Sequence, residues 1–184
     1  MIPIIVAVLL FASAWISNYD PFISGSRGYA SQDPRIRTSD VSVFGVDGRV
    51  FTIPMSDPTR FRYTFLVVND GPIAVTITGV GSPVDEPPAA LTTKPVRIVP
   101  DERTPGPNGA LVYEPWHPFV LKPGQEAGIE MLLAYRPSSC FGRGATMSVW
   151  PETIRFTVLG IPRETTFESD LELRIVATED CPDS

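Results

Sequence analysis

Apolar residues recur at every second position in much of the chain after residue 40, which is the pattern of a half-buried β-strand. In one run, Phe61, Tyr63, Phe65 and Val67 alternate with Arg62 and other side chains of the opposite face. The pattern predicts strands around residues 41–43, 61–67, 73–77, 96–98, 119–121, 129–135, 154–158 and 171–175. We expect residues 163–169 to form a connection to the last strand.

Dense turn signals separate these runs. Asn69-Asp70-Gly71-Pro72 predicts a hairpin or a corner at which the chain changes sheets. Lys122-Pro123-Gly124-Gln125 fits a type II turn, because proline occupies its second position and glycine its third.

Seven or eight strands without a convincing helix after the N-terminus predict an all-β fold. Long βαβ crossovers are missing, so we expect antiparallel sheets. The pattern favours an immunoglobulin-like β-sandwich, with a jelly roll or a small barrel as alternatives.

Residues 81–118 interrupt the alternation of apolar and polar residues and contain nine of the twenty prolines. Because proline lacks the backbone N–H that a central strand needs, we expect an insertion that crosses the surface or covers a sheet edge. Long ordered loops often carry function. The candidate interaction surface is therefore Tyr113, Trp116, His117 and Phe119.

The first nineteen residues carry no Lys, Arg, Asp or Glu. Residues 1–16 are apolar or small, and aromatic Trp15 and Tyr19 stand where an interfacial belt would lie. We expect residues 1–19 to bind the lipid bilayer as a transmembrane or signal-anchor helix. Ala12-Ser13-Ala14 supports the alternative of a cleaved signal peptide and a secreted protein.

The polar stretch 20–40 is rich in Ser, Gly, Asp, Pro and Arg and predicts a flexible stalk. The folded domain is then expected to cover residues 41–184, including the proline-rich insertion.

The chain of 184 residues has a net charge of −6, which argues against a nucleic-acid-binding surface of the usual basic kind. Thirteen of its fifteen basic residues are arginines. They are spread over strands and loops of both faces, so the excess of arginine does not predict a site that binds a ligand through guanidinium groups.

Cys140 and Cys181 are too far apart in sequence for a compact CxxC redox or zinc motif. We expect a disulfide that joins the C-terminal tail to a loop between strands, with two unrelated free thiols as the alternative. An exported domain would retain such a bond, whereas the cytosol would reduce it.

His117 is the single histidine of the chain. A metal site would lack a second imidazole, and a Ser/His/Asp triad would depend on this one base without a GxSxG motif. The sequence therefore predicts no cofactor, no metal site and no enzymatic activity.

Residues 65–77 (FLVVNDGPIAVTI), residues 119–126 (FVLKPGQE) and the two late cysteines are similar to elements of many exported sandwich domains. On these residues the chain resembles bacterial membrane-anchored extracytoplasmic proteins with a single immunoglobulin-like domain. The resemblance implies a single-pass protein of the cell membrane whose C-terminal domain is extracytoplasmic, and it implies no catalytic residues.

The expected function is a membrane-tethered, non-enzymatic interaction or accessory module whose partner is another envelope protein. Two alternatives remain at this point. One is a domain that handles a solute or a metal ion through the proline-rich segment and His117, and the other is an envelope hydrolase.

Overall fold

The computed structural model describes residues 15, 18–25, 33–43, 46–55, 59–81, 90–99, 112–136, 142–149, 152–167 and 171–177. Apart from single turns and Trp15, the regular structure of this part of the chain consists of β-strands. The all-β prediction is therefore confirmed.

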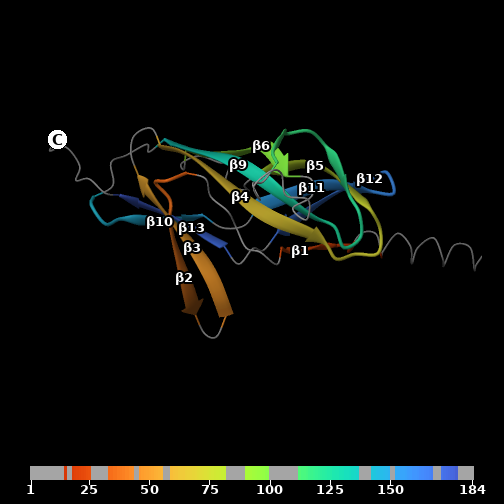
Figure 1. The fold of residues 1–184 in the computed structure, drawn as a ribbon, viewed down its shortest axis with the longest axis horizontal. Coiled ribbons are helices and arrows are strands. Elements are labelled where there is room, and N and C mark those ends of the chain that lie inside the picture. Colours follow the sequence, from red (N-terminus) through yellow and green to blue (C-terminus); the bar gives the residue numbers. More distant parts are fainter. Residues whose placement is uncertain are drawn as a thin grey trace, which may run out of the picture.

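The largest sheet, sheet A, has five strands and runs through the length of the domain (Figure 1). Its order is β1 (Phe22–Ser24), β4 (Thr59–Asn69), β9 (Glu126–Arg136), β6 (Ala90–Val99) and β7 (Glu114–Pro115). All its neighbouring strands are antiparallel.

Two four-stranded sheets complete the fold. Sheet B has the order β10 (Thr146–Val149), β13 (Leu171–Ala177), β3 (Val46–Met55) and β2 (Arg37–Val43). Sheet C has the order β12 (Ile161–Phe167), β11 (Glu152–Val158), β5 (Val75–Gly81) and β8 (Phe119–Leu121). In Figure 1, sheets B and C lie toward opposite ends of the long strands β4 and β9.

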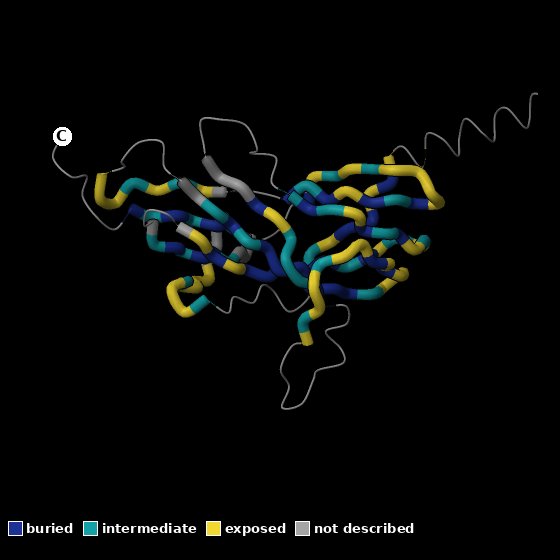
Figure 2. Tube along the Cα trace, turned by 90° about the horizontal axis from the view of Figure 1, so that it is seen from above, coloured by how far each residue is buried: buried dark blue, intermediate teal, exposed yellow. Residues whose placement is uncertain are grey.

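One hydrophobic core joins the three sheets, and buried residues alternate with exposed ones along the strands (Figure 2). Sheet A contributes Phe61, Tyr63 and Phe65 from β4, as the alternating pattern predicted. Two aromatic contacts tie it to sheet C: the ring centroids of Phe22 and Phe156 lie 4.9 Å apart, and those of Phe65 and Phe167 lie 5.6 Å apart.

Both predicted turns are present. Gly124 has a φ of +68°, and the amide of Gln125 donates to the carbonyl of Lys122 at 3.0 Å, as a type II turn requires. The turn after Asn69 is the corner at which the chain passes from sheet A to sheet C.

Asn69 holds these two turns together although its own side chain is fully buried. Its Nδ2 donates to the carbonyls of Ile73 and Leu121, each at 2.9 Å, and its Oδ1 accepts from the amide of Gly71 at 3.0 Å. One amide side chain thus satisfies three backbone groups from two turns.

The expectation of antiparallel sheets fails at one pair, because β3 and β13 are parallel. The absence of βαβ units does not exclude such a pair. A parallel pair needs only a long connection, and here most of the domain connects the two strands.

The expected stalk at residues 20–40 is wrong for the described part of that segment. β1 pairs with the end of β4, Phe22 enters the core, and Arg37 to Asp40 belong to β2. The sequence pattern of β1 gives little indication of a strand, because β1 has only three residues and its central side chain, Ile23, points outward.

The expected insertion at residues 81–118 also needs correction, because it includes β6, a ten-residue strand of sheet A. Pro95 is accommodated by a register shift between Pro95 and Arg97. Residues 163–167, expected to belong to a connection, are part of β12 at the edge of sheet C, where Pro162 requires no ladder partner on its open side.

We predict that Asn69→Ala lowers the free energy of unfolding by about 3 kcal/mol, because it leaves buried backbone groups without partners. The measurement is chemical denaturation of the purified full chain. The neighbouring exposed Asp70 provides the control, and Asp70→Ala should change stability by less than about 0.5 kcal/mol. Equal effects of the two substitutions would contradict the role assigned to Asn69.

Candidate anion-binding groove

The outward face of sheet A carries a buried carboxylate. Glu130 on β9 is 1% exposed, although its neighbours Ile129 and Met131 point into the core on the other face. The strand register places Thr64 of β4 on one side of Glu130 and Arg97 of β6 on the other. The bulge after Pro95 brings Arg97 into this register.

Two guanidinium groups neutralise Glu130. Arg97 donates through Nε and Nη2 to its two carboxylate oxygens, each at 2.5 Å, in the bidentate geometry typical of arginine. The Nη1 atom of Arg62 lies 3.7 Å from Oε2. The hydrogen bond to Glu130 raises the pKa of Arg97 above its ordinary value.

Tyr113 covers this pair from outside. The Arg97 guanidinium carbon lies 4.2 Å from the centroid of the tyrosine ring, within the range of a cation–π contact. The Tyr113 hydroxyl also lies 3.4 Å from that of Thr64. Arg97 is therefore held by a carboxylate and an aromatic face, and its position is fixed.

A third arginine approaches along the edge of β4. Arg35 pairs with Asp33 at 2.7 Å and donates to the backbone carbonyl of Arg60 at 2.6 Å. Its guanidinium lies 4.4 Å from the centroid of the Phe61 ring. The Arg35 hydrogen bond holds the pKa of Asp33 below its usual value, against an opposing effect of burial.

These residues line a hollow of about 450 Å³ that we call the arginine groove. Its walls are Asp33, Pro34, Arg35, Arg60, Phe61, Arg62, Arg97, Glu130 and Leu132. Four guanidinium groups thus face two carboxylates, in a protein whose net charge is −6. The groove is a local region of positive charge on an acidic molecule.

The chemistry of the groove suits carboxylate or phosphate groups. Arg35 donates through Nε and Nη2 to both oxygens of Asp33, and Arg62 pairs with Glu130. The two side chains still keep 51% and 53% of their surface exposed, so part of each guanidinium group faces solvent. The half-buried Leu132 adds apolar wall, which suits a ligand with an aliphatic stem, whereas the Phe61 ring is 1% exposed and lies beneath Arg35.

Sequence reasoning missed this site. The arginines belong to separate segments, and only the folded sheet shows that Arg97, the register partner of Glu130, and Arg62, two residues before Thr64 on the neighbouring strand, approach the same glutamate. The sequence did not lead us to expect a cluster of arginines, and the structure places four of them around one hollow. The only local indication of the groove in the sequence is the charged Glu130 between the two apolar residues Ile129 and Met131.

The four residues of the predicted interaction surface lie in different surroundings in the structure. Tyr113 belongs to the arginine groove region, whereas Phe119 is 9% exposed and belongs to the core. Trp116 packs against Phe119 with ring centroids 5.9 Å apart. His117 is exposed, and its Nδ1 lies 3.0 Å from the carbonyl oxygen of Pro115. The four side chains therefore do not form one exposed patch.

Other expectations concern residues outside the described part. Cys140 and Cys181 lie there, as do residues 1–14. Within the described ranges, no helix has the length and apolar character to cross a membrane. Nor do three His, Cys, Asp or Glu side chains of these ranges gather as metal ligands.

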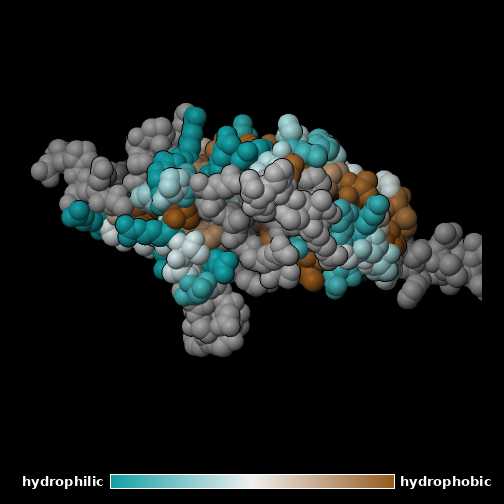
Figure 3. Space-filling view, viewed as in Figure 1, coloured by the Kyte–Doolittle hydropathy of each residue, from teal (hydrophilic) through white to brown (hydrophobic). Residues whose placement is uncertain are grey.

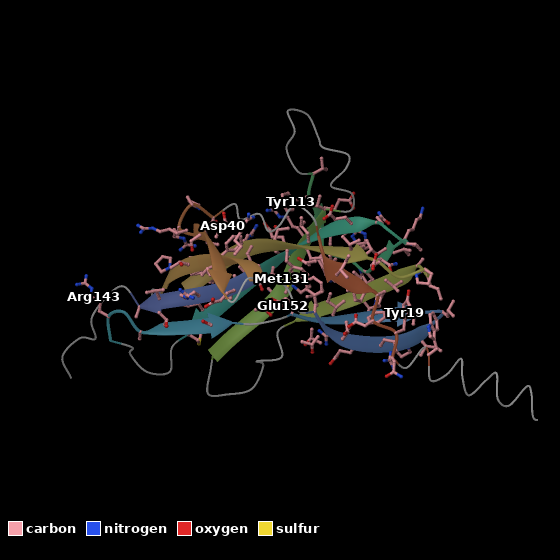
Figure 4. All side chains as sticks on the ribbon, turned by 90° about the horizontal axis from the view of Figure 1, so that it is seen from below. Tyr19, Asp40, Tyr113, Met131, Arg143 and Glu152 are labelled. Atoms are coloured by element: carbon pink, nitrogen blue, oxygen red, sulfur yellow. The ribbon has the colours of Figure 1, made fainter. Side chains whose placement is uncertain are left out.

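Glu152 is a second buried carboxyl group, placed between the sheets near Met131 (Figure 4). The Tyr63 hydroxyl donates to its Oε1, and Thr93 forms a further hydrogen bond. Burial raises the pKa of Glu152 to about 7. Shifted carboxyl groups often mark catalytic sites. Glu152 is only 7% exposed, however, and this enclosure favours a structural role.

Comparisons with known proteins assign no family. No family model and no curated protein matches the chain. Among solved structures, the chain is similar to the structure of Vibrio cholerae VesB protease, with 11% identity and a TM-score of 0.35. The match covers 78% of this chain and 32% of that chain, so this chain spans about a third of that protein's length.

We predict that Glu152 makes stability decrease as pH rises. A carboxyl whose pKa is raised to about 7 in the folded state binds its proton more tightly there than in the unfolded chain. Its contribution is therefore fully present below about pH 4.5, declines between pH 4.5 and 7, and amounts to about 3 kcal/mol.

The measurement is the free energy of unfolding of the wild type and of Glu152→Gln between pH 4.5 and 8. The difference between the two proteins should change by the amount stated above. Glu164→Gln, an exposed change on β12, should preserve the wild-type pH dependence. A Glu152→Gln variant with an unaltered pH profile would refute the assignment.

Proposed function

We propose that this protein is a membrane-tethered, non-enzymatic interaction module that binds an acidic segment of another envelope protein. The arginine groove is the observation that carries the proposal. Its buried Glu130 fixes Arg97, while the half-exposed Arg35 and Arg62 present guanidinium groups to solvent. Such a fixed arrangement favours recognition of carboxylates over random attraction of ions.

An immunoglobulin-like sandwich is the proposed fold family. Support comes from the mainly antiparallel strands around one core and from the corner at Asn69, where the chain changes sheets. The pair of β3 and β13 departs from the antiparallel pattern, because these two strands are parallel.

The proposed location is the cell membrane, with the domain extracytoplasmic. The uncharged residues 1–14 support the tether, and the two cysteines support an oxidising compartment. Tyr19, at the end of the expected anchor, is instead buried in the core of the domain. β10 and β13 are antiparallel, and the amide of Gly144 donates to the carbonyl of Ala177 at 2.9 Å. The chain leading to Cys140 and the chain leading to Cys181 therefore leave from neighbouring points, which favours a disulfide.

We predict that peptide mapping of the protein isolated without reductant finds Cys140 and Cys181 in one linked pair of peptides. Reduction should separate them and should lower stability, because the bond closes a long loop. Two thiols that react with an alkylating reagent in the native protein would contradict both the disulfide and the extracytoplasmic location.

We predict that crosslinking in native membranes captures a partner protein and that Arg35→Ala combined with Arg62→Ala reduces the capture severalfold. Both side chains are exposed by about half, so their removal should leave the fold intact. Arg97 is kept, because its loss would leave Glu130 buried without its closest partner.

Arg155→Ala is the matched control, because Arg155 is an exposed arginine of sheet C. It should leave capture unchanged. Recovery of the free monomer alone from wild-type membranes would overturn the proposal, as would equal capture by the groove variant.

A further inference from the structure

The turn between β11 and β12 places a leucine where the backbone favours glycine or asparagine. Val158 pairs with Ile161, so the loop consists of Leu159 and Gly160 alone. Their φ angles are +51° and +79°, as in a type I′ hairpin turn. Leu159 is the only described residue other than glycine with a positive φ.

Leu159 is also one of the most exposed large apolar residues, with 68% of its surface accessible. Ile161, two residues later, is 43% exposed. A leucine at this position is unfavourable for the backbone, and its side chain, with 68% of its surface exposed, gains little from packing against the described residues. A contact outside the domain would remove the exposed side chain from water.

The N-terminal segment presents two more exposed apolar side chains. Trp15 is 41% exposed and Ile23 is 47% exposed. With Pro72 they border an open hollow of about 640 Å³. Tyr19 anchors the segment, because its side chain is buried and its hydroxyl lies 3.4 Å from the carbonyl oxygen of Ile73.

These two groups lie at the same end of the molecule. Val75 pairs with Val158, which brings the turn at Leu159 level with the start of β5, next to Ile73 and hence to Tyr19. Tyr19 and Arg143 mark opposite ends of the domain in Figure 4. Hydrophobic residues are also visible at the β1 and β12 end in Figure 3.

We infer that this end of the domain, which we call the apolar tip, rests on the lipid bilayer. The tip is defined by Trp15, Ile23, Leu159 and Ile161. The inference rests on the proposed membrane tether. The apolar, uncharged residues 1–14 directly precede Trp15 in the sequence, so a bilayer that holds them would lie close to the tip.

The charges around the tip specify the kind of lipid surface. Asp20 and Asp70 border the hollow, and Lys122 lies in the turn that adjoins Asn69. Among the described residues that border the hollow, none is basic, so they offer no cluster for anionic headgroups. The contact is apolar, and it should form on zwitterionic phosphatidylcholine as well as on mixed bilayers.

This orientation would direct the arginine groove sideways and away from the lipid. The groove lies on the outward face of sheet A, and Arg35, Arg62 and Arg97 are bound there to residues of β4 and β9. A tip seated on the membrane would thus leave the groove accessible to a neighbouring envelope protein.

The test is lipid photocrosslinking with the full chain in phosphatidylcholine nanodiscs. Variants carry p-benzoylphenylalanine in place of Leu159, of Ile161 or of Arg143. The position of Ile161 guards against a folding defect at the strained turn, because its backbone is that of an ordinary strand. We expect lipid adducts at Leu159 and Ile161 to exceed those at Arg143 severalfold.

The same experiment separates the inference from the proposed function. Nanodisc-bound protein with equal adducts at all three positions would overturn the seated tip and leave the tether standing. Protein that does not associate with nanodiscs at all would overturn both.

A second variant tests whether Leu159 occupies the turn because its side chain contacts lipid. Asparagine tolerates a positive φ, so Leu159→Asn should preserve or raise the stability of the fold. With the photoreactive residue at Ile161, the same substitution should reduce lipid adducts. Unchanged adducts would show that Leu159 does not contact lipid, and lower stability would show that the leucine serves the fold.

Discussion

The inward faces of β4 and β9 are the constraint on which the rest of the structure depends. Their apolar side chains alternate along eleven-residue strands, and the register joins Tyr63 to Met131 at the middle. Sheet C packs on the part that contains Phe65, and core residues of sheet B such as Phe51 and Ile175 belong to the same cluster. Because both smaller sheets share one partner, the burial of a single apolar face holds the domain together.

The same strands determine what the opposite face can do. Strict alternation sends Glu130 outward between two core residues, and a buried carboxylate on that face requires cations. Arg97 supplies the close bidentate pair, and Arg62 supplies a longer contact. The arginine groove is therefore a consequence of how the core strands pair, and its geometry should be as rigid as the sheet beneath it.

The sequence predicts the strands with regular alternation and the turns with strong local chemistry, such as Pro123-Gly124. It misses elements whose stability comes from their neighbours. β1 has three residues, β12 contains Pro162 at a sheet edge, and β6 needs a bulge at Pro95. The groove is missed for a related reason, since it depends on pairing between strands that are distant in sequence. Alternation within one strand does not specify which strand lies beside it.

The central claim is that the groove recognises carboxylates, and a direct binding measurement tests it. A fluorescent oligoglutamate peptide is titrated with the full chain in nanodiscs, and anisotropy is followed at increasing salt concentration. The account predicts saturable binding that weakens as salt increases and is lost when Arg35 and Arg62 are both alanine, with no change for Arg155→Ala. Equal binding of the peptide by wild type and the double variant would contradict it.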